Sequence, residues 1–238
     1  MIRDTVFFDL DGTLLPLDMD VYVAGFMELL EKENCSSLSG KIKKSDVLDK
    51  AFGFMMSEKH GDMTNEKAYL FAFEKETGIS QDETKAFFED FYDTHFDTLQ
   101  YASKLEPTSK QVIDIIKQKG YTLVLATNPV FAKVATFKRL EWAGLDADDF
   151  DYISLFDNSC YCKPSLNYYK EILKKIEKQA CNCFMVGNNV EEDMCSVKLG
   201  FEAFLLTDYL IGDIREAPLC EKGNYSDLYH WAKSLPKI

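Results

Sequence analysis

The chain has 238 residues, of which 46% are hydrophobic and 28% are charged. These fractions are close to the averages of globular proteins, so they exclude a fibrous or largely disordered chain. The 40 acidic residues outnumber the 27 basic ones and give a formal net charge of −13, the opposite of the charge that favours nucleic-acid binding. We therefore expect a globular protein of one large or two modest domains that does not bind nucleic acid.

The sequence predicts neither export nor membrane insertion. No stretch approaches the ~20 apolar residues of a membrane span, and the apolar run before Asp9 is too short for a secretion signal. The seven cysteines are odd in number, which favours reduced thiols. We expect a cytoplasmic protein without a membrane partner, and no pattern predicts its oligomeric state.

The first element is a short apolar run at residues 5–8, typical of a buried strand. Asp9 and a turn signal at Gly12 and Thr13 follow it. Between residues 14 and 101 the apolar residues recur with helical period. This region predicts about four helices and no strand.

After Pro107 strands and helices alternate along the chain. We expect further strands at residues 123–126, 152–156, 183–186 and 203–206, and helices closed by Gly120 and Gly144 and at residues 166–176, 191–199 and 226–235. Near-continuous apolar strands joined through helices are typical of a parallel sheet covered on both faces. The predicted fold is a Rossmann-like, three-layer α/β/α core at residues 1–15 and 103–238, with an all-α domain inserted at residues 16–102.

Ligands of open parallel sheets bind at the carboxyl ends of the strands, where Asp9 and Asp11 are expected. Two residues apart on an extended chain, they point to the same side with Cα atoms ~6.6 Å apart. Such a pair either holds a divalent cation such as Mg²⁺ or keeps one carboxyl protonated as a general acid while the other is a nucleophile. The alternative is a plain turn at Asp11 and Gly12.

Thr127 and Asn128 follow the strand expected at residues 123–126. Asn128 with Pro129 has the sequence of a helix N-cap followed by proline at the first helical position. A hydroxyl and free N–H groups at a helix start form an anion site, although helix capping alone also explains these residues.

Lys163 precedes Pro164, which is expected to open the next helix, where the helix dipole disfavours a cation. A phosphate oxygen would compensate for this unfavourable placement. Asn188 and Asp193 follow the strand expected at residues 183–186. Asp193 either belongs to the site or is an ordinary acidic residue of a first helical turn.

Taken together in this order, these residues resemble the motifs of the haloacid dehalogenase-like hydrolase superfamily. The D-x-D-G-T sequence at residues 9–13 matches the first motif, Thr127 the second and Lys163 the third. The fourth motif, an acidic pair after a strand, matches only in part because Asn188 stands where the family usually has an acid. The helical insertion resembles the family's cap, and the likeness of the core covers residues 1–15 and about 103–210.

The resemblance implies a Mg²⁺-dependent phosphatase that hydrolyses a small phosphorylated metabolite through an aspartyl-phosphate. In this scheme Asp9 attacks phosphorus, and Asp11 protonates the leaving alcohol and then activates water. The implied phosphate-binding residues are Thr127, Asn128 and Lys163, and the implied metal site is formed by Asp9, Asp11, Asn188 and Asp193. Asn188 provides a carbonyl oxygen without charge, which predicts weaker metal binding.

Asp11 favours the phosphatase branch over the dehalogenases, because a halide leaving group needs no general acid. Two alternatives stay open. One is a phosphomutase that uses the same aspartyl-phosphate. The other is a catalytically weakened, phosphate-binding or regulatory relative, which Asn188 would explain.

Overall fold

The computed structural model describes residues 3–33 and 45–238. Its centre is a six-stranded parallel sheet with the order β3-β2-β1-β4-β5-β6. The strands are β1 (Thr5–Phe8), β2 (Thr122–Leu125), β3 (Tyr152–Ile153), β4 (Cys183–Gly187), β5 (Glu202–Leu206) and β6 (Glu221–Gly223). In the central register, Phe8 pairs with Leu125 on one side and Val186 on the other.

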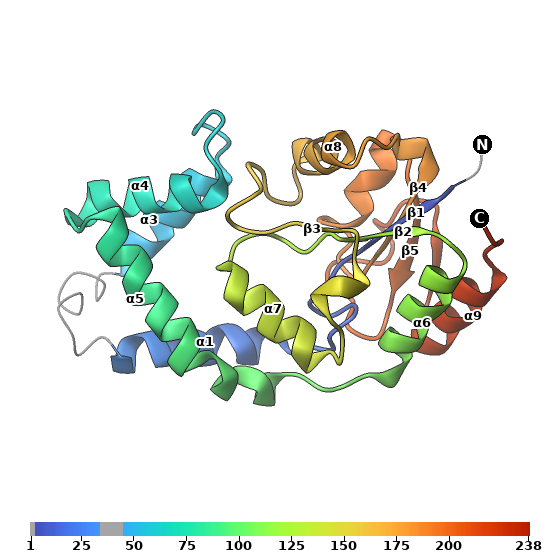
Figure 1. Cartoon of the computed structure of the whole chain (residues 1–238), viewed down its shortest axis with the longest axis horizontal. Coiled ribbons are helices and arrows are strands. Elements are labelled where there is room, and N and C mark those ends of the chain that lie inside the picture. The colour runs from blue at the N-terminus through green and yellow to red at the C-terminus, as the bar shows by residue number, and fades with distance from the viewer. Residues whose placement is uncertain (1–2, 34–44) are drawn as a thin grey trace.

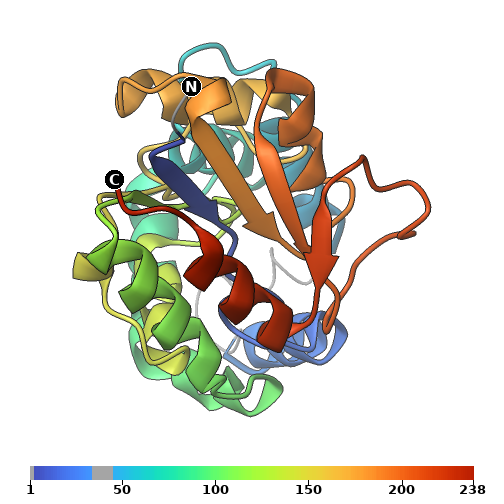
Figure 2. The same cartoon turned by 90° about the vertical axis from the view of Figure 1, so that its right-hand side faces the viewer.

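Successive residues of the strands pack on opposite faces of the sheet, as the pleat requires. Phe8 and Val186 face a hydrophobic cluster that includes α6 (Pro107–Gln118) and α9 (Tyr225–Ser234). Phe7 and Met185 face a second cluster beneath α8 (Leu166–Lys175) and the 3₁₀ helix η4 (Met194–Leu199). Figure 2 shows the sheet between these layers. The Rossmann-like α/β/α prediction is confirmed.

A helical segment lies between β1 and α6 in the chain. It consists of α1 (Met19–Glu33), α3 (Ser45–Met56), α4 (Asn65–Thr77), α5 (Gln81–Thr94) and the 3₁₀ helix η1 (Phe96–Ala102). Its helix ends follow local sequence signals. Thr64 caps α4, Gly78 ends it with a left-handed φ of 70°, and Ser80 caps α5. Figure 1 shows the segment beyond the edge of the sheet at which the strands end.

The two connections between this segment and the core lie side by side. Leu17 and Ser103 form an antiparallel bridge, and the Lys104 N–H donates to the Pro16 carbonyl at 3.0 Å. These contacts fall at the boundaries predicted for residues 1–15, 16–102 and 103–238. The division into two domains stays a prediction.

The sheet differs from the expected one at its two edges. β3 ends at Ile153 instead of residue 156, because the chain turns there and the Leu155 N–H donates to the Asn158 side chain at 2.8 Å. β6 was not expected, since its sequence Glu-Lys-Gly has no apolar residue. β6 therefore lacks the apolar signal that marks the inner strands, whereas β3 has it and is cut short by the turn.

Three expectations about helix starts are wrong, although α8 itself begins at Leu166, the first residue of its predicted range. α7 (Lys133–Trp142) starts after Ala132, so Asn128 is not its cap. α8 starts after its cap Ser165, so Pro164 is not its first residue. The helix expected at residues 191–199 is only the 3₁₀ helix η4. The Asn189 side chain accepts hydrogen bonds from the N–H groups of Glu191 and Glu192 and so holds a turn in place of the first helical residues. In the described segments no helix combines the length and apolarity needed to span a bilayer.

Candidate active site

The site is centred on Lys163, whose ammonium lies between two carboxylates. Its Nζ is 2.8 Å from Asp9 Oδ1 and 2.6 Å from Asp193 Oδ1. Asp9 follows β1, and Asp193 lies beyond the end of β4, the neighbouring strand. The three charges therefore meet at the carboxyl end of the sheet although they are far apart in the sequence.

Lys163 is fully buried. Burial alone would lower its pKa, but the charges of Asp193 and Asp9 hold that pKa well above the usual lysine value. Burial also raises the pKa of the Asp193 carboxyl, and the Lys163 ammonium opposes this effect. We therefore assign Lys163 as a permanent cation beside the Asp9 carboxylate.

Asp11 forms an ion pair with Arg139, which sequence reasoning missed. Nη1 of Arg139 donates to Oδ2 of Asp11, and the guanidinium lies over the Phe131 ring, 5.1 Å from its centroid. Oδ1 of Asp11 is buried and has no hydrogen-bond partner among the described residues. Burial raises the pKa of Asp11, and the charge of Arg139 opposes the rise. Asp11 therefore has one oxygen fixed and one available for a proton.

The position of Arg139 within the α7 sequence could have pointed to its role. It lies one turn after Ala135 and three residues before Trp142, both of which are buried. A charged residue on the apolar stripe of a helix needs a partner inside the protein. The sequence pattern could therefore have marked Arg139 as paired, although not with Asp11.

Thr13 joins Asp9 to Asn188. Its hydroxyl oxygen is 3.2 Å from Asp9 Oδ2 and 3.1 Å from Asn188 Oδ1. Asn188 Nδ2 donates to the Tyr209 carbonyl at 2.6 Å, which fixes the direction of the amide. Gly12, with φ of 79°, allows this approach, because a Cβ there would collide with Asn188. Neither Thr13 nor Tyr209 was singled out as a partner of Asn188 from the sequence.

Thr127 and Asn128 follow β2 beside these groups. The Thr127 carbonyl accepts hydrogen bonds from Ser154 Oγ and Tyr168 OH, each at 2.8 Å. Asn128 Oδ1 accepts from the Lys163 backbone N–H at 3.1 Å. Asn128 therefore braces the loop that carries Lys163.

The oxygen donors fit a hard cation such as Mg²⁺. Thr13 has one hydroxyl proton for the two oxygens of Asp9 and Asn188 that face it, so one of those oxygens keeps its lone pairs free. Within residues 3–33 and 45–238 no three His, Cys, Asp or Glu side chains form a ready-made metal cluster. Both oxygens of Asp193 already accept hydrogen bonds, from Lys163 and from the Asn189 N–H.

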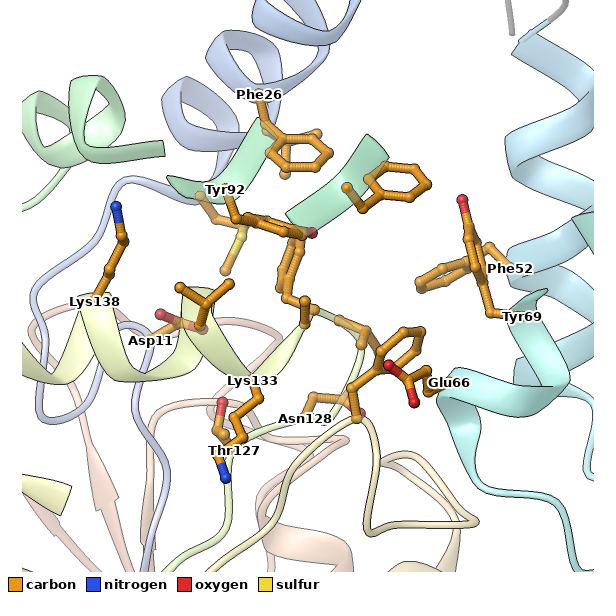
Figure 3. A pocket seen from close by; sticks show the side chains of 18 of the residues that line it. Asp11, Phe26, Phe52, Glu66, Tyr69, Tyr92, Thr127, Asn128, Lys133 and Lys138 are labelled. Atoms are coloured by element: carbon orange, nitrogen blue, oxygen red, sulfur yellow. The ribbon is translucent and has the colours of Figure 1, made fainter. Parts of the chain in front are cut away.

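A cavity of about 1110 Å³ opens over the site. Asp11 and Thr127 lie at its core end, and Phe26, Tyr92 and Tyr69 of the helical segment line the rest (Figure 3). The cavity therefore connects the carboxylates with a space under the helices.

The carboxylates, the buried lysine and the parallel sheet define a hydrolase with an α/β core. A family model of haloacid dehalogenase-like hydrolases matches residues 3–196, and the chain belongs to this family. No curated protein matches the sequence.

Solved structures of this fold cover almost the whole chain. HAD-hydrolase YfnB from Bacillus subtilis, bound to magnesium, is 20% identical, with a TM-score of 0.58 and coverage of 98% of this chain and 99% of its own. A predicted phosphoglycolate phosphatase from Haemophilus somnus is 19% identical, with a TM-score of 0.60 and 97% of both chains covered. L-2-haloacid dehalogenase from Xanthobacter autotrophicus is 15% identical, with a TM-score of 0.58 and coverage of 99% and 100%. These likenesses show the shared fold.

Proposed function

We propose that this hydrolase is a Mg²⁺-dependent phosphatase that cleaves a phosphate monoester of a metabolite. The observation that carries the proposal is the position of the Lys163 ammonium, 2.8 Å from the Asp9 carboxylate and buried with it. This cation holds Asp9 in place and neutralises an incoming phosphoryl oxygen. Asp11, two residues after Asp9, supplies the second carboxyl group.

The reaction proceeds in two displacements. A carboxylate oxygen of Asp9 forms a bond to phosphorus while the bond from phosphorus to the ester oxygen breaks, and the protonated Asp11 gives its proton to the leaving alcohol. Asp11 then takes a proton from water as the water oxygen attacks phosphorus. The bond between phosphorus and Asp9 breaks, and inorganic phosphate leaves.

Asp11 is suited to this exchange because its Oδ1 has no hydrogen-bond partner in the described structure. Burial raises the pKa of Asp11, and the charge of Arg139 limits this rise. Such a balance favours a group that both gives and accepts a proton. A halide leaving group would need no such acid. Asp11 therefore favours phosphatase over dehalogenase activity, although the fold is common to both.

Mg²⁺ would be held by the Asp9 carboxylate, the Asp11 backbone carbonyl and Asn188 Oδ1. Its chemistry would be to neutralise charge on the transferring phosphoryl group. Asp193, predicted as a ligand, is held by Lys163 and Asn189, so we assign it to positioning the lysine. Thr127 and Asn128, after β2, would help to bind the phosphoryl oxygens. The helical segment would act as the cap over this site.

The test is release of inorganic phosphate from a panel of phosphate esters with Mg²⁺, with the Asp9→Asn variant as the blank. We expect hydrolysis by the wild-type chain, none by Asp9→Asn, and strong loss in Asp11→Asn. Hydrolysis that survives in Asp9→Asn would overturn the assignment of the nucleophile. Release of an isomerised sugar phosphate without free phosphate would instead identify a phosphomutase.

A further inference from the structure

The cavity above the carboxylates is much larger than a phosphoryl group requires. Its volume of about 1110 Å³ exceeds the roughly 300–1,000 Å³ of ordinary small-molecule sites. Asp9 and Asp11 line one end, so the remaining space is continuous with the reactive groups. It is the space that the leaving alcohol of a substrate would occupy.

The wall nearest the site is aromatic. Phe26 of α1 packs edge-on against Phe131, with ring centroids 5.6 Å apart, and lies 6.2 Å from the Tyr92 ring of α5. All three rings line the cavity (Phe26 and Tyr92 are labelled in Figure 3). Because they come from both the helical segment and the core, they form a continuous apolar surface next to Asp11.

The far part of the cavity also presents apolar side chains. Phe52 of α3 lines it although 42% of its surface is exposed, and Val23 of α1, which also lines the cavity, is 45% exposed. Large apolar side chains left open to water inside a concave site are typical of surfaces that an apolar ligand covers. Figure 3 places Phe52 and Tyr69 together at this end, away from Asp11.

The charged groups of the wall disfavour a second anionic group. Lys85 is paired with Glu66 at 3.1 Å, and Lys138 with Asp97 at 2.7 Å. Lys133 lies over the Phe137 ring, 5.3 Å from its centroid. Among the described residues that line the cavity these are the only lysines, and no arginine joins them. Two of these three lysines are therefore already neutralised by acids, and Asp49, Glu89, Glu141 and Asp157 also line the cavity, so a nucleotide or a bisphosphate would meet a wall with more negative than positive charge.

We propose that the substrate is a phosphate monoester of an alcohol with a large hydrocarbon portion, which lies in this cavity from Phe26 to Phe52. The proposal rests on the proposed phosphatase function. It replaces the small metabolite expected from the sequence by a large ester with one phosphate group and no other charged group. The hydrocarbon binds by removing its own surface and that of the wall from water.

The test is a homologous series of ethyl, butyl, octyl and decyl phosphates with Mg²⁺, compared with glucose phosphate and phosphoglycolate. We expect kcat/KM to rise about two- to fourfold per added methylene until the cavity is filled. Phe52→Ser should reduce the advantage of octyl over ethyl phosphate. Phe71→Ser is the matched control, because Phe71 is equally exposed at 42% but does not line the cavity.

Binding of the corresponding alkylphosphonates, measured by calorimetry, separates the two proposals. Affinity that rises with chain length, with a negative heat-capacity change, supports the apolar site even if no ester is hydrolysed, in which case the phosphatase proposal alone fails. Hydrolysis of the polar esters with no dependence on chain length overturns the apolar substrate alone. Neither hydrolysis nor chain-length-dependent binding overturns both.

Discussion

Arg139 is 1% exposed and donates a hydrogen bond to Asp11 from inside the core. The pair joins α7 to the loop after β1, so a helix that provides no nucleophile or metal ligand still sets the charge around the proposed general acid. Nε of the same guanidinium donates to the Ala135 carbonyl at 3.2 Å, which fixes the arginine to its own helix.

Replacing Arg139 by glutamine should change the pH dependence of catalysis. Loss of the cation removes the charge that opposes the burial-raised pKa of Asp11, so this pKa rises further. Because Asp11 must be protonated when the alcohol leaves, the pH above which kcat/KM falls should move upward. We also expect kcat to fall by about tenfold or more. The control is Arg215→Gln, which removes an exposed guanidinium paired with Asp213 and should leave the pH profile unchanged. If the alkaline side of the profile does not shift in Arg139→Gln, Asp11 is not the general acid that Arg139 controls.

Lys163→Met should destabilise the fold as well as abolish activity. It leaves the carboxylates of Asp9 and Asp193 buried without their cation, which typically costs about 3–5 kcal/mol. Urea unfolding measures this loss. Adding Asp193→Asn should recover part of it without restoring activity, whereas a further loss would argue against the pairing. Lys50→Met, at an exposed ion pair, should change stability by less than about 1 kcal/mol.

Asn188→Asp tests why an amide stands in the metal site. The new side chain has no N–H for the Tyr209 carbonyl, so the free energy of unfolding should fall by about 1–3 kcal/mol in a chelator. Mg²⁺ should restore stability, because a carboxylate binds it more strongly than an amide oxygen. The Mg²⁺ concentration for half-maximal activity should also fall. If that concentration is unchanged, Asn188 is not a ligand.

The lowered pKa of Asp149 predicts that this residue stops stabilising the fold in acid. Burial raises the pKa of this carboxyl, but hydrogen bonds from the Asp146 N–H, Lys110 and Lys117 outweigh burial and bring the pKa below its usual 3.8. A carboxyl with a lowered pKa in the folded state stabilises above the unfolded value and loses this contribution as pH falls through the folded value. Asp149→Asn should therefore destabilise by up to about 1 kcal/mol near neutral pH, and the difference should vanish as the pH falls through the lowered pKa of the folded state. A difference that persists in acid would exclude the charge as its cause.

The four inner strands could be predicted from the sequence, β3 was predicted with its end too late, and β6 was not predicted. β1, β2, β4 and β5 lie within two residues of their expected bounds because each is an apolar run covered on both faces. β6 pairs through its backbone with β5, so its side chains carry no pattern that marks a strand.

The structure brings together residues that the sequence had named as candidates, but the hydrogen bonds and ion pairs among them could not be predicted. Asn128 has the local sequence of a helix cap, yet its side chain accepts a hydrogen bond from the backbone of Lys163, 35 residues later. Arg139 and Asp11 are 128 residues apart. Such pairings depend on tertiary packing, which overrides local preference, and no single segment contains the information.

The antiparallel bridge of Leu17 with Ser103 brings the start and the return of the helical segment to one point on the core. Because the two ends meet there, a change of length within the segment need not move the strands that precede Asp9 and Thr127. Its Tyr92 and Phe96 nevertheless belong to the same buried cluster as Phe8 of β1, so a change of this face of the segment would reach the sheet.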